Sequence, residues 1–301
     1  MGSSGLKPWA RFVHYTSAEA ALKIIVSKRV WMRNTTCMAD YSEVQHGFEI
    51  LQKFFAEDTR KTQFYEAIDA VSPNIAGEAI TLFNQWWNNI RFSTYITSIS
   101  EHDDKEDLHG RLSMWRAFGG NTARVAIILR LPWFSAGSEA LNLMVSPVAY
   151  LREEEAHTVL ATVIENIRAN HDFLVSIERS AVVATVFTML VAGVTCLKHE
   201  GFHEEREWRV IYAPERAPSA HMESSIEVVG GIPQIVYKLP LDAKVSDALA
   251  ELDLARMFDR LIIGPSEFAW PMHEAFTKVL TAMGVEQAET RVFTSGIPIR
   301  S

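Results

Sequence analysis

Two acidic side chains, Glu205 and Glu207, stand two residues apart at the entrance to a β-branched, aromatic segment, residues 208–212. Successive side chains of a strand point to opposite faces of a sheet. If the chain is already extended at Glu205, both carboxylates and Arg209 share one face, and Trp208 lies on the other. Carboxylates held in this way can stabilise a developing positive charge or accept a proton as a general base.

A second pattern overlaps the first, because His199-Glu200-Gly-Phe-His203 fits the H-E-x-x-H motif of zinc enzymes. That motif requires both histidines on one helical face, with the glutamate over a metal-bound water. Gly201 costs a helix about 1 kcal/mol relative to alanine, and a strand-like segment follows within a few residues. The third-ligand candidates, Glu223 and Glu227, lack a helical pattern. We therefore assign no metal ligand and keep a zinc hydrolase as an alternative.

Polar side chains also occur on two earlier segments that read as strands. His14 lies on the first predicted strand, and Thr97, Ser98 and Ser100 lie on a later one. Each has a structural explanation: a strand histidine is commonly a hydrogen-bonded core residue, and serine and threonine are ordinary in strands. Glu207 beside Arg209 is commonly a paired or solvated face. Taken together, the three strands predict one shared cleft.

Alternation and helical periodicity predict an α+β chain. The first helix is expected to begin at a capping box formed by Thr16 and Glu19, and Asp40 and Glu43 repeat that spacing at the next. The helix at 112–118 is expected to close at Gly119-Gly120. The predicted strands are 11–15, 30–33, 93–100, 125–131, 143–151, 208–212, 226–229, 235–239, 260–263 and 291–294. The predicted helices are 18–28, 40–57, two segments that meet near Pro73, 112–118, 153–170, 173–198, 243–258 and 266–283.

We expect a single α+β domain over residues 1–301, with helical insertions at about 41–92 and 152–198. The sequence has 301 residues, 48% of them hydrophobic and 22% charged, which is typical of a globular chain. Its net charge of -8 does not favour a broad basic surface for nucleic acid. The apolar run 181–197 carries three threonines and falls short of the roughly 20 residues that a membrane helix needs, so we predict a buried helix.

Two cysteines, Cys37 and Cys196, form no C-x-x-C pair, which argues against a disulfide framework or a cysteine zinc site. The first residues lack the apolar core of a signal peptide, so we expect a cytoplasmic protein with no membrane partner. No P-loop, dinucleotide fingerprint or nucleophile elbow is present. We expect Trp86, Trp87 and Trp115 to fill core or subdomain contacts and not to stack on a base, and the acidic segment 101–107 to be a solvated loop.

Residues spread along the whole chain resemble a bacterial family of domains of unknown function. The matching positions are His14-Tyr15-Thr16, Trp31, Asp40 to Glu43, Ser98 to Ser100, Met114-Trp115, Gly119-Gly120, Glu205 to Arg209, Ile262 to Pro265, and Ser295.

A more distant resemblance supplies a chemistry. A His-Tyr-Thr first strand, a serine-rich middle strand and a late-strand glutamate resemble the ADP-ribosyltransferase fold, which implies a split antiparallel β core and NAD as substrate. The resemblance implies that Glu207 holds the nicotinamide ribose and that Glu205 serves as its catalytic helper. It further implies that NAD is bound by His14, Tyr15 and Thr16 on the first strand and by Ser98 and Ser100 on the middle strand. Arg209 is expected to bind NAD by meeting a phosphate, or to keep the two acids ionised.

The sequence departs from the superfamily's pattern at two places. The Glu-x-Glu variant usually pairs with arginine on the first strand, where this chain has His14, and the middle strand reads Thr-Ser-Ile-Ser. The resemblance implies ADP-ribosyl transfer or NAD hydrolysis, with protein, nucleic acid or water as acceptor. The type of family suggests a bacterial toxin or phage-defence effector. The alternative is a non-catalytic domain that binds a nucleotide or a partner, in which His14 and Glu207 are structural.

Overall fold

The computed structural model describes residues 9–38, 41–117, 123–132 and 136–298. The chain divides into two compact units. Unit 1 comprises 1–33, 95–145 and 204–301, and unit 2 comprises 34–94 and 146–203. Unit 2 contains the two segments predicted as insertions, at about 41–92 and 152–198. Asp40, the predicted cap of the second helix, and Gly119-Gly120, the predicted end of the fifth, lie outside the described residues.

Unit 1 is built on a large mixed sheet, and the described residues give it ten strands. Its main path runs β12 (Val292–Thr294), β11 (Phe258–Ile263), β4 (Arg124–Pro132), β1 (Trp9–Ser17), β3 (Tyr95–Glu101), β2 (Arg29–Asn34), β10 (Ile232–Pro240) and β9 (Glu223–Val229). β8 (Glu207–Tyr212) pairs with β3, and β5 (Met144–Pro147) pairs with β8. β11 and β12 run parallel, whereas β1 runs antiparallel to both β3 and β4. The prediction of a mixed α and β fold is therefore confirmed.

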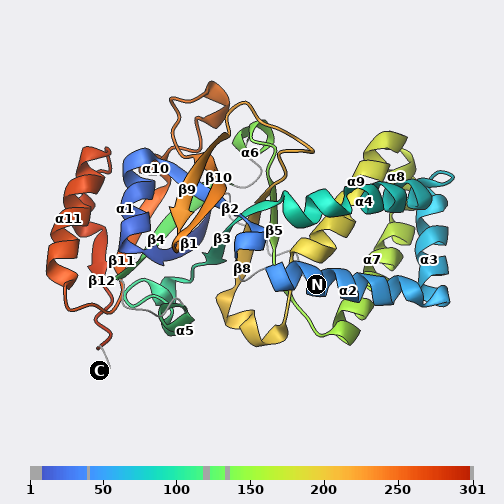
Figure 1. The fold of residues 1–301 in the computed structure, drawn as a ribbon, viewed down its shortest axis with the longest axis horizontal. Coiled ribbons are helices and arrows are strands. Elements are labelled where there is room, and N and C mark those ends of the chain that lie inside the picture. The colour runs from blue at the N-terminus through green and yellow to red at the C-terminus, as the bar shows by residue number, and fades with distance from the viewer. Residues whose placement is uncertain (1–8, 39–40, 118–122, 133–135, 299–301) are drawn as a thin grey trace. The chain divides into compact units, whose positions relative to one another are not determined.

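Helices cover both faces of this sheet (Figure 1). α1 (Ala18–Ser27), α10 (Leu254–Met257) and α11 (Ala269–Ala282) bury their apolar side chains with Ile127 and Leu129 of β4. α5 (Leu112–Ala117) packs on the opposite face with Ala126 and Ile128 of the same strand. The alternation along β4 thus divides the core of unit 1 into two layers.

The start of α1 corrects one prediction. Ser17, not Thr16, is the N-cap residue, because the side chain of Ser17 accepts a hydrogen bond from the main-chain N–H of Ala20 at 3.1 Å. Thr16 remains in β1, where it pairs with Val125 of β4. The strand therefore continues one residue past the predicted cap.

The prediction of one helix over residues 243–258 is wrong. The structure has a 3-10 turn, η4 (Asp247–Leu249), and the short α10 in its place. Ser246 caps the first element, and the carboxylate of Asp253 accepts from the N–H groups of Ala255 and Arg256 at the start of the second. The segment has a composition that favours helix, but these two capping side chains each start a new short helix and so interrupt it. The other short elements of unit 1 are η2 (Asp104–Glu106), α6 (Ala136–Ala140) and η5 (Ala288–Thr290).

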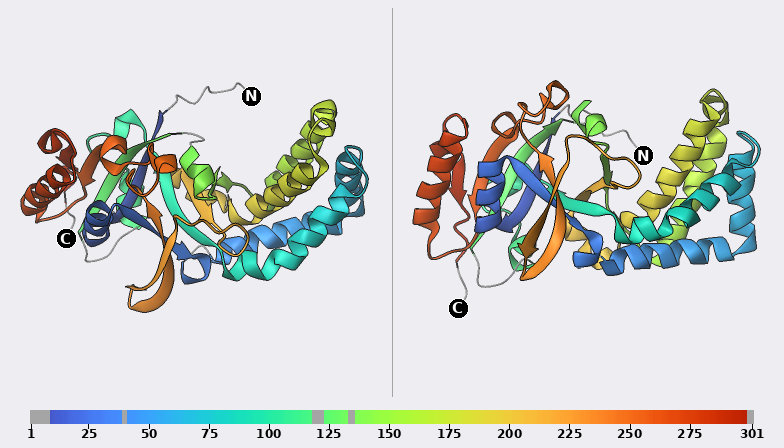
Figure 2. Two further views of the ribbon diagram at one scale, coloured as in Figure 1. Left: turned by 90° about the horizontal axis from the view of Figure 1, so that it is seen from above. Right: turned by 45° about the horizontal axis from the view of Figure 1, so that its top comes forward.

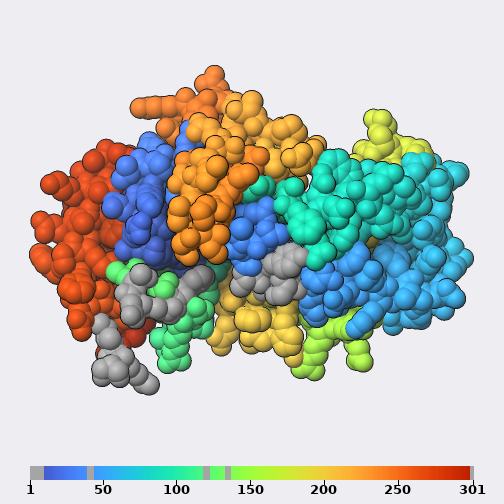
Figure 3. Space-filling view, viewed as in Figure 1, coloured from blue at the N-terminus to red at the C-terminus, as the bar shows by residue number. Residues whose placement is uncertain are grey.

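β9 and β10 form a hairpin at the end of the sheet, and its residues reach the surface (Figure 3). Val229 pairs with Ile232, so the loop consists of Gly230 and Gly231, with φ of 61° and 82°. Two successive positive φ angles define the tight turn that matches strand twist, and glycine adopts them without steric cost. Ile232 and Pro233, predicted as part of the turn, belong to β10.

Unit 2 is mainly helical (Figure 2). Its longer helices are α2 (Tyr41–Ala56), α3 (Asp58–Asp69), α4 (Ile75–Phe92), α7 (Glu153–Ala169) and α9 (Arg179–Thr195). Its short elements are η1 (Thr35–Cys37), β6 (Ala149–Tyr150), α8 (His171–Val175) and β7 (Leu197–Lys198), and η3 (Glu200–Glu205) begins in unit 2 and ends in unit 1. α9 packs against α2 and α4, and Trp87 stacks on Phe48 at 3.8 Å between ring centroids. The predicted packing role of Trp87 is confirmed.

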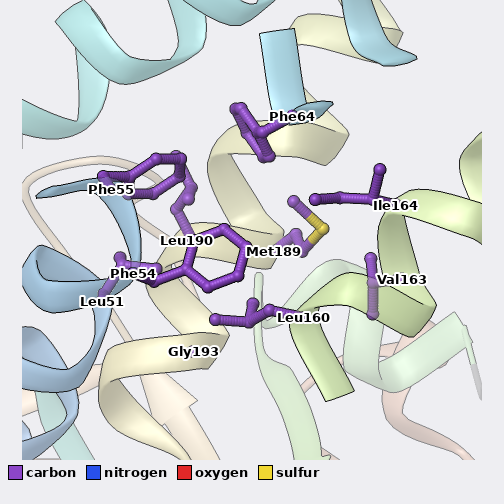
Figure 4. Close-up of a pocket in the computed structure, with 10 residues that line it drawn as sticks. All are labelled: Leu51, Phe54, Phe55, Phe64, Leu160, Val163, Ile164, Met189, Leu190 and Gly193. Carbon is purple, nitrogen blue, oxygen red and sulfur yellow. The ribbon is translucent and has the colours of Figure 1, made fainter. Parts of the chain in front are cut away.

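α9 contains most of the apolar run that was predicted to be a buried helix, and six of its hydrophobic side chains are buried: Val182, Val186, Phe187, Leu190, Val191 and Val194. In the described parts of the chain, no helix combines the length and apolar character needed to cross a membrane. A small apolar cavity of about 20 Å³ lies beside this helix (Figure 4). Leu51 and Phe54 of α2, Ile164 of α7, and Leu190 and Gly193 of α9 are among the residues that line it.

Candidate functional site

β3 is the strand that brings the candidate residues together, because it lies between β1 and β8. Ser100 pairs with Val13 of β1 on one side and with Glu207 of β8 on the other. Ser98 lies opposite Arg209. Directly paired residues of antiparallel strands project from the same face, so these two serines, Glu207 and Arg209 share one face.

β1 and β3 separate next to this pair. Their ladder consists of Phe12–Glu101 and Val13–Ser100, and the next residue of β1, His14, instead places its imidazole Nδ1 2.9 Å from the main-chain oxygen of Ser98. A carbonyl oxygen can only accept, so Nδ1 carries the proton and Nε2 of the neutral ring is an acceptor. Nε2 makes no hydrogen bond to any residue that the structure describes.

Burial controls the ionisation of His14. Desolvation lowers the pKa of the imidazole below its ordinary value, and the hydrogen bond to the Ser98 carbonyl opposes this only in part. The ring is therefore neutral near pH 7. A neutral histidine with its proton fixed on Nδ1 presents a hydrogen-bond acceptor at Nε2, suited to a ligand hydroxyl.

Ser98 joins both ends of the site. Its Oγ donates to Oε1 of Glu207 at 2.5 Å, while its main-chain oxygen accepts from His14. Nε of Arg209 also donates to Oε1 of Glu207, at 3.0 Å. Glu207 is 5% exposed and Arg209 is fully buried, so this carboxylate has the charged partner that a buried acid requires.

Two predicted residues of the first strand lie elsewhere. Tyr15 packs edge-on against Trp115 at 4.9 Å between ring centroids, and its hydroxyl accepts from the N–H of Arg111 at 2.8 Å. Burial raises the pKa of this phenol to about 12. Tyr15 is thus a core residue beneath α5, and neither it nor Thr16 contacts Ser98 or Glu207 through a described hydrogen bond. Trp115 is 6% exposed, which confirms its predicted packing role.

Glu205 does not lie on the strand that carries Glu207. It ends the 3-10 turn η3, and Arg206 has a positive φ of 45°, so the extended chain begins only at Glu207. The two-residue alternation expected for the acids therefore does not apply. The main-chain oxygen of Glu205 accepts a hydrogen bond from Arg111 at 2.8 Å, and its side chain is partly exposed.

Glu200 to His203 of the H-E-x-x-H segment lie in η3, and His199 precedes it, so the motif is not on an α-helix. Nδ1 of His203 is 3.0 Å from the main-chain oxygen of Glu200, and the carboxylate of Glu200 accepts from Arg152 at 2.6 Å. Nδ1 of His199 accepts from Gly201 at 3.1 Å. Within the described residues, no three histidine, cysteine or acidic side chains are grouped as a metal site. The arrangement does not match the helical geometry on which the zinc alternative depends.

The acidic segment predicted to be a solvated loop is held by arginines. Arg11 binds Asp104 and Asp107 at 2.6 and 2.5 Å, and Arg111 binds Glu106 at 3.0 Å. Burial opposes ionisation of Asp107, but hydrogen bonds from Arg11 and His102 hold its pKa below the ordinary value. The loop after β3 is therefore an ordered, ion-paired segment beside the candidate site.

Comparison with known proteins places one part of the chain. Residues 114–210 match the family model described as "Protein of unknown function (DUF2971)". The predicted resemblance to a family of unknown function is thus confirmed over that segment. No curated protein and no solved structure matches the chain.

The DUF2971 segment contains Glu207 and Arg209 of β8 but ends before β9 and begins after β3. His14 and Ser98 therefore join the candidate site from outside the matched segment. Sequence reasoning missed Arg111, which contacts both the end of β3 and the turn before β8. Residue spacing does not signal these contacts, since the main-chain oxygens that its side chain binds lie 10 to 94 residues away.

Proposed function

We propose that this protein binds NAD and cleaves its nicotinamide–ribose bond, transferring ADP-ribose to an acceptor or to water. The observation that carries the proposal is the double contact of Ser98. Its main chain accepts from His14 of β1, and its side chain donates to Glu207 of β8. The three residue types and their strand order are those that the resemblance to ADP-ribosyltransferases implies.

The chemistry assigns a distinct task to each group. Cleavage of the nicotinamide–ribose bond develops positive charge on the ribose as nicotinamide departs with the bonding electrons. A carboxylate beside the ribose, such as Glu207, stabilises that charge most strongly in the transition state, which is the condition for accelerating the reaction. The bond from Ser98 orients the carboxylate, and Nε2 of neutral His14 accepts from a ribose hydroxyl.

The acceptor then bonds to the ribose carbon from which nicotinamide has left. When water is the acceptor, its oxygen forms the new bond and it loses one proton, giving ADP-ribose and free nicotinamide. Glu205, partly exposed in the turn just before β8, is the candidate base for that proton. By strand register, His14 lies on the face of Ile127 and Glu207 on the face of Val13. A ligand that reaches both must therefore pass between β1 and β3 where these strands separate.

A non-catalytic domain is the second candidate, and the burial of Glu207 favours it. A carboxylate that is 5% exposed and bonded to a fully buried arginine is also what a structural ion pair looks like. In that case Ser98, Glu207 and Arg209 stabilise the β3–β8 pairing, and any nucleotide or partner binds without being changed.

Release of nicotinamide from labelled NAD separates the two candidates. The purified protein is incubated with NAD alone and with a cell lysate, and Glu207→Gln is compared with wild type. We expect a loss of release of about 10²–10³-fold, the effect of removing one charge-stabilising group. Glu227→Gln is the matched control, because Glu227 is a strand glutamate of β9 paired with Lys238, away from β3.

Folding must be controlled, since removing one partner of a buried ion pair costs about 3–5 kcal/mol. Ser98→Ala keeps the pair of Glu207 and Arg209 and deletes only the hydroxyl that orients the carboxylate. It should reduce nicotinamide release while the protein stays folded by circular dichroism. Absence of release by the wild-type protein with every acceptor tested would refute the enzymatic proposal.

A further inference from the structure

Arg111 is a nearly buried arginine whose side chain uses all five of its N–H donors. The exposed fraction of its side chain is 10%. Nε and Nη2 bind the two carboxylate oxygens of Glu106 at 3.0 and 3.1 Å. Nη2 also donates to the main-chain oxygen of Glu101 at 2.8 Å, and Nη1 donates to those of Glu204 and Glu205, both at 2.8 Å. Complete use of the guanidinium fork fixes its position in three directions.

These acceptors lie at the end of β3, in the turn before β8 and in the loop between β3 and α5. Glu101 ends β3, Glu204 and Glu205 precede β8, and Glu106 lies in η2. Next to them, the N–H of Glu101 donates to the oxygen of Arg206 at 2.9 Å, and Ser100 pairs with Glu207. Arg111 therefore holds the entrance of β8 against the end of β3.

The main chain of Arg111 is fixed as well. Its N–H donates to Tyr15, and its neighbour Gly110 has a φ of 65° that brings it under the ring of Trp115. A Cβ at Gly110 would lie 2.7 Å from that ring, so only glycine fits there. The arginine thus projects from a rigid support toward the start of β8.

We propose that Arg111 is a positioning residue that holds Glu207 in register with Ser100 and so within hydrogen-bond reach of Ser98. This inference rests on the proposed function. Lysine has the same charge but donates from a single nitrogen, so it cannot bind the main-chain oxygens of both strands and Glu106 together. Without the clamp, the turn at Arg206 is released, and the carboxylate of Glu207 loses its fixed distance from the ribose.

The test compares Arg111→Lys with Arg11→Lys in the full chain. Arg11 holds the same acidic loop through Asp104 and Asp107, and also binds Asp259, but its described bonds do not reach residues 204–207. Both changes should lower the melting temperature, because both weaken the loop. We expect only Arg111→Lys to lower kcat for nicotinamide release, by about 10²-fold as for a misplacement of about 1 Å, with KM for NAD unchanged.

Deuterium uptake by the peptide containing residues 204–208 gives a readout that does not require activity. Arg111→Lys should raise its uptake, and Arg11→Lys should leave it as in wild type. Equal kcat or equal uptake for the two variants would overturn the positioning role. If wild type releases no nicotinamide, the proposed function fails, and the difference in uptake alone then supports or overturns the clamp at the start of β8.

Discussion

Ser98 shows how one small side chain can serve two neighbours without conflict. Its main-chain oxygen accepts a hydrogen bond from His14 where β1 has left the ladder, and its hydroxyl donates a separate one to Glu207. A larger residue at this position would separate the carboxylate from the strand. As a result, the neutral His14 of β1 and the buried carboxylate of Glu207 in β8 both form a hydrogen bond with Ser98 of β3.

The ionisation of His14 predicts how the stability of the folded protein changes with pH. Because burial lowers the pKa of this histidine in the folded protein, the unfolded chain, with a pKa of about 6.5, takes up the proton first as pH falls. The contribution of neutral His14 to stability is therefore fully present above the unfolded-state pKa. It is lost as pH falls from that value toward the lower pKa of the folded protein. Thermal unfolding of wild type should show a falling melting temperature as pH decreases below about 6.5.

His14→Asn is the variant that isolates this contribution, because the amide nitrogen replaces Nδ1 as donor to Ser98 and does not titrate. We expect a shallower decline of melting temperature with falling pH than in wild type. Burial also lowers the pKa of His102, so some decline should remain in the variant. An unchanged slope would show that His14 is not buried as a neutral ring.

At the scale of elements, the packing of α2 against α9 requires a glycine at one position and leaves room for a side chain at another. A Cβ built on Gly47 of α2 would lie 2.8 Å from the main-chain oxygen of Val194 in α9, so the helices approach too closely for any side chain. A Cβ on Gly193 would meet no atom within 4 Å, and this residue lines the apolar cavity. The two positions make a matched pair within one interface.

We predict opposite effects of the two alanine substitutions on the free energy of unfolding. Gly193→Ala should stabilise the protein by about 1 kcal/mol, the difference in helix propensity. Gly47→Ala should destabilise it by about 1–3 kcal/mol, because the helix backbones must separate. Urea unfolding monitored by circular dichroism measures both. A loss of stability in Gly193→Ala would contradict the open space beside α9.

At the scale of the whole molecule, unit 1 should be most stable at the centre of its sheet. β4 lies between β1 and β11, and Val125, Ala126 and Ile128 are fully buried. β9 ends the strand order, and Ile226 and Val228 are 76% and 64% exposed. Local opening is least costly where few apolar contacts must be broken.

Hydrogen exchange followed by mass spectrometry should therefore protect peptides from β4 longest and exchange those from β9 early. Peptides from β10 should be intermediate, because β10 pairs with β2 as well as with β9. Slow exchange in β9 would indicate that another chain covers this end of the sheet in solution. Fast exchange in β4 would contradict the two-layered core.

Local chemistry determined most of the elements from the sequence alone. The β-branched alternation at residues 93–100 predicts β3, the apolar run at 181–197 predicts the buried α9, and the Gly-Gly pair predicts the β9–β10 turn, all of which depend on neighbouring residues. The sequence also pointed to the candidate residues, because polar side chains on three predicted strands together suggest a shared cleft, although each of them alone is ordinary in a strand. Hydrophobic periodicity alone did not predict where capping side chains such as Asp253 interrupt a helix.

Only the tertiary structure decided which of these polar residues meet. Ser98 lies 84 residues from His14 and 109 from Glu207, and strand pairing over such distances depends on the whole sheet. Arg206 has a positive φ, so β8 begins at Glu207 and Glu205 stays in the turn before it. Tyr15 packs in the core beneath α5. The role of Arg111 could be inferred only from its contacts in the folded chain. Its guanidinium binds main-chain oxygens that the fold brings near it, and the spacing of residues in the sequence does not predict which oxygens these are.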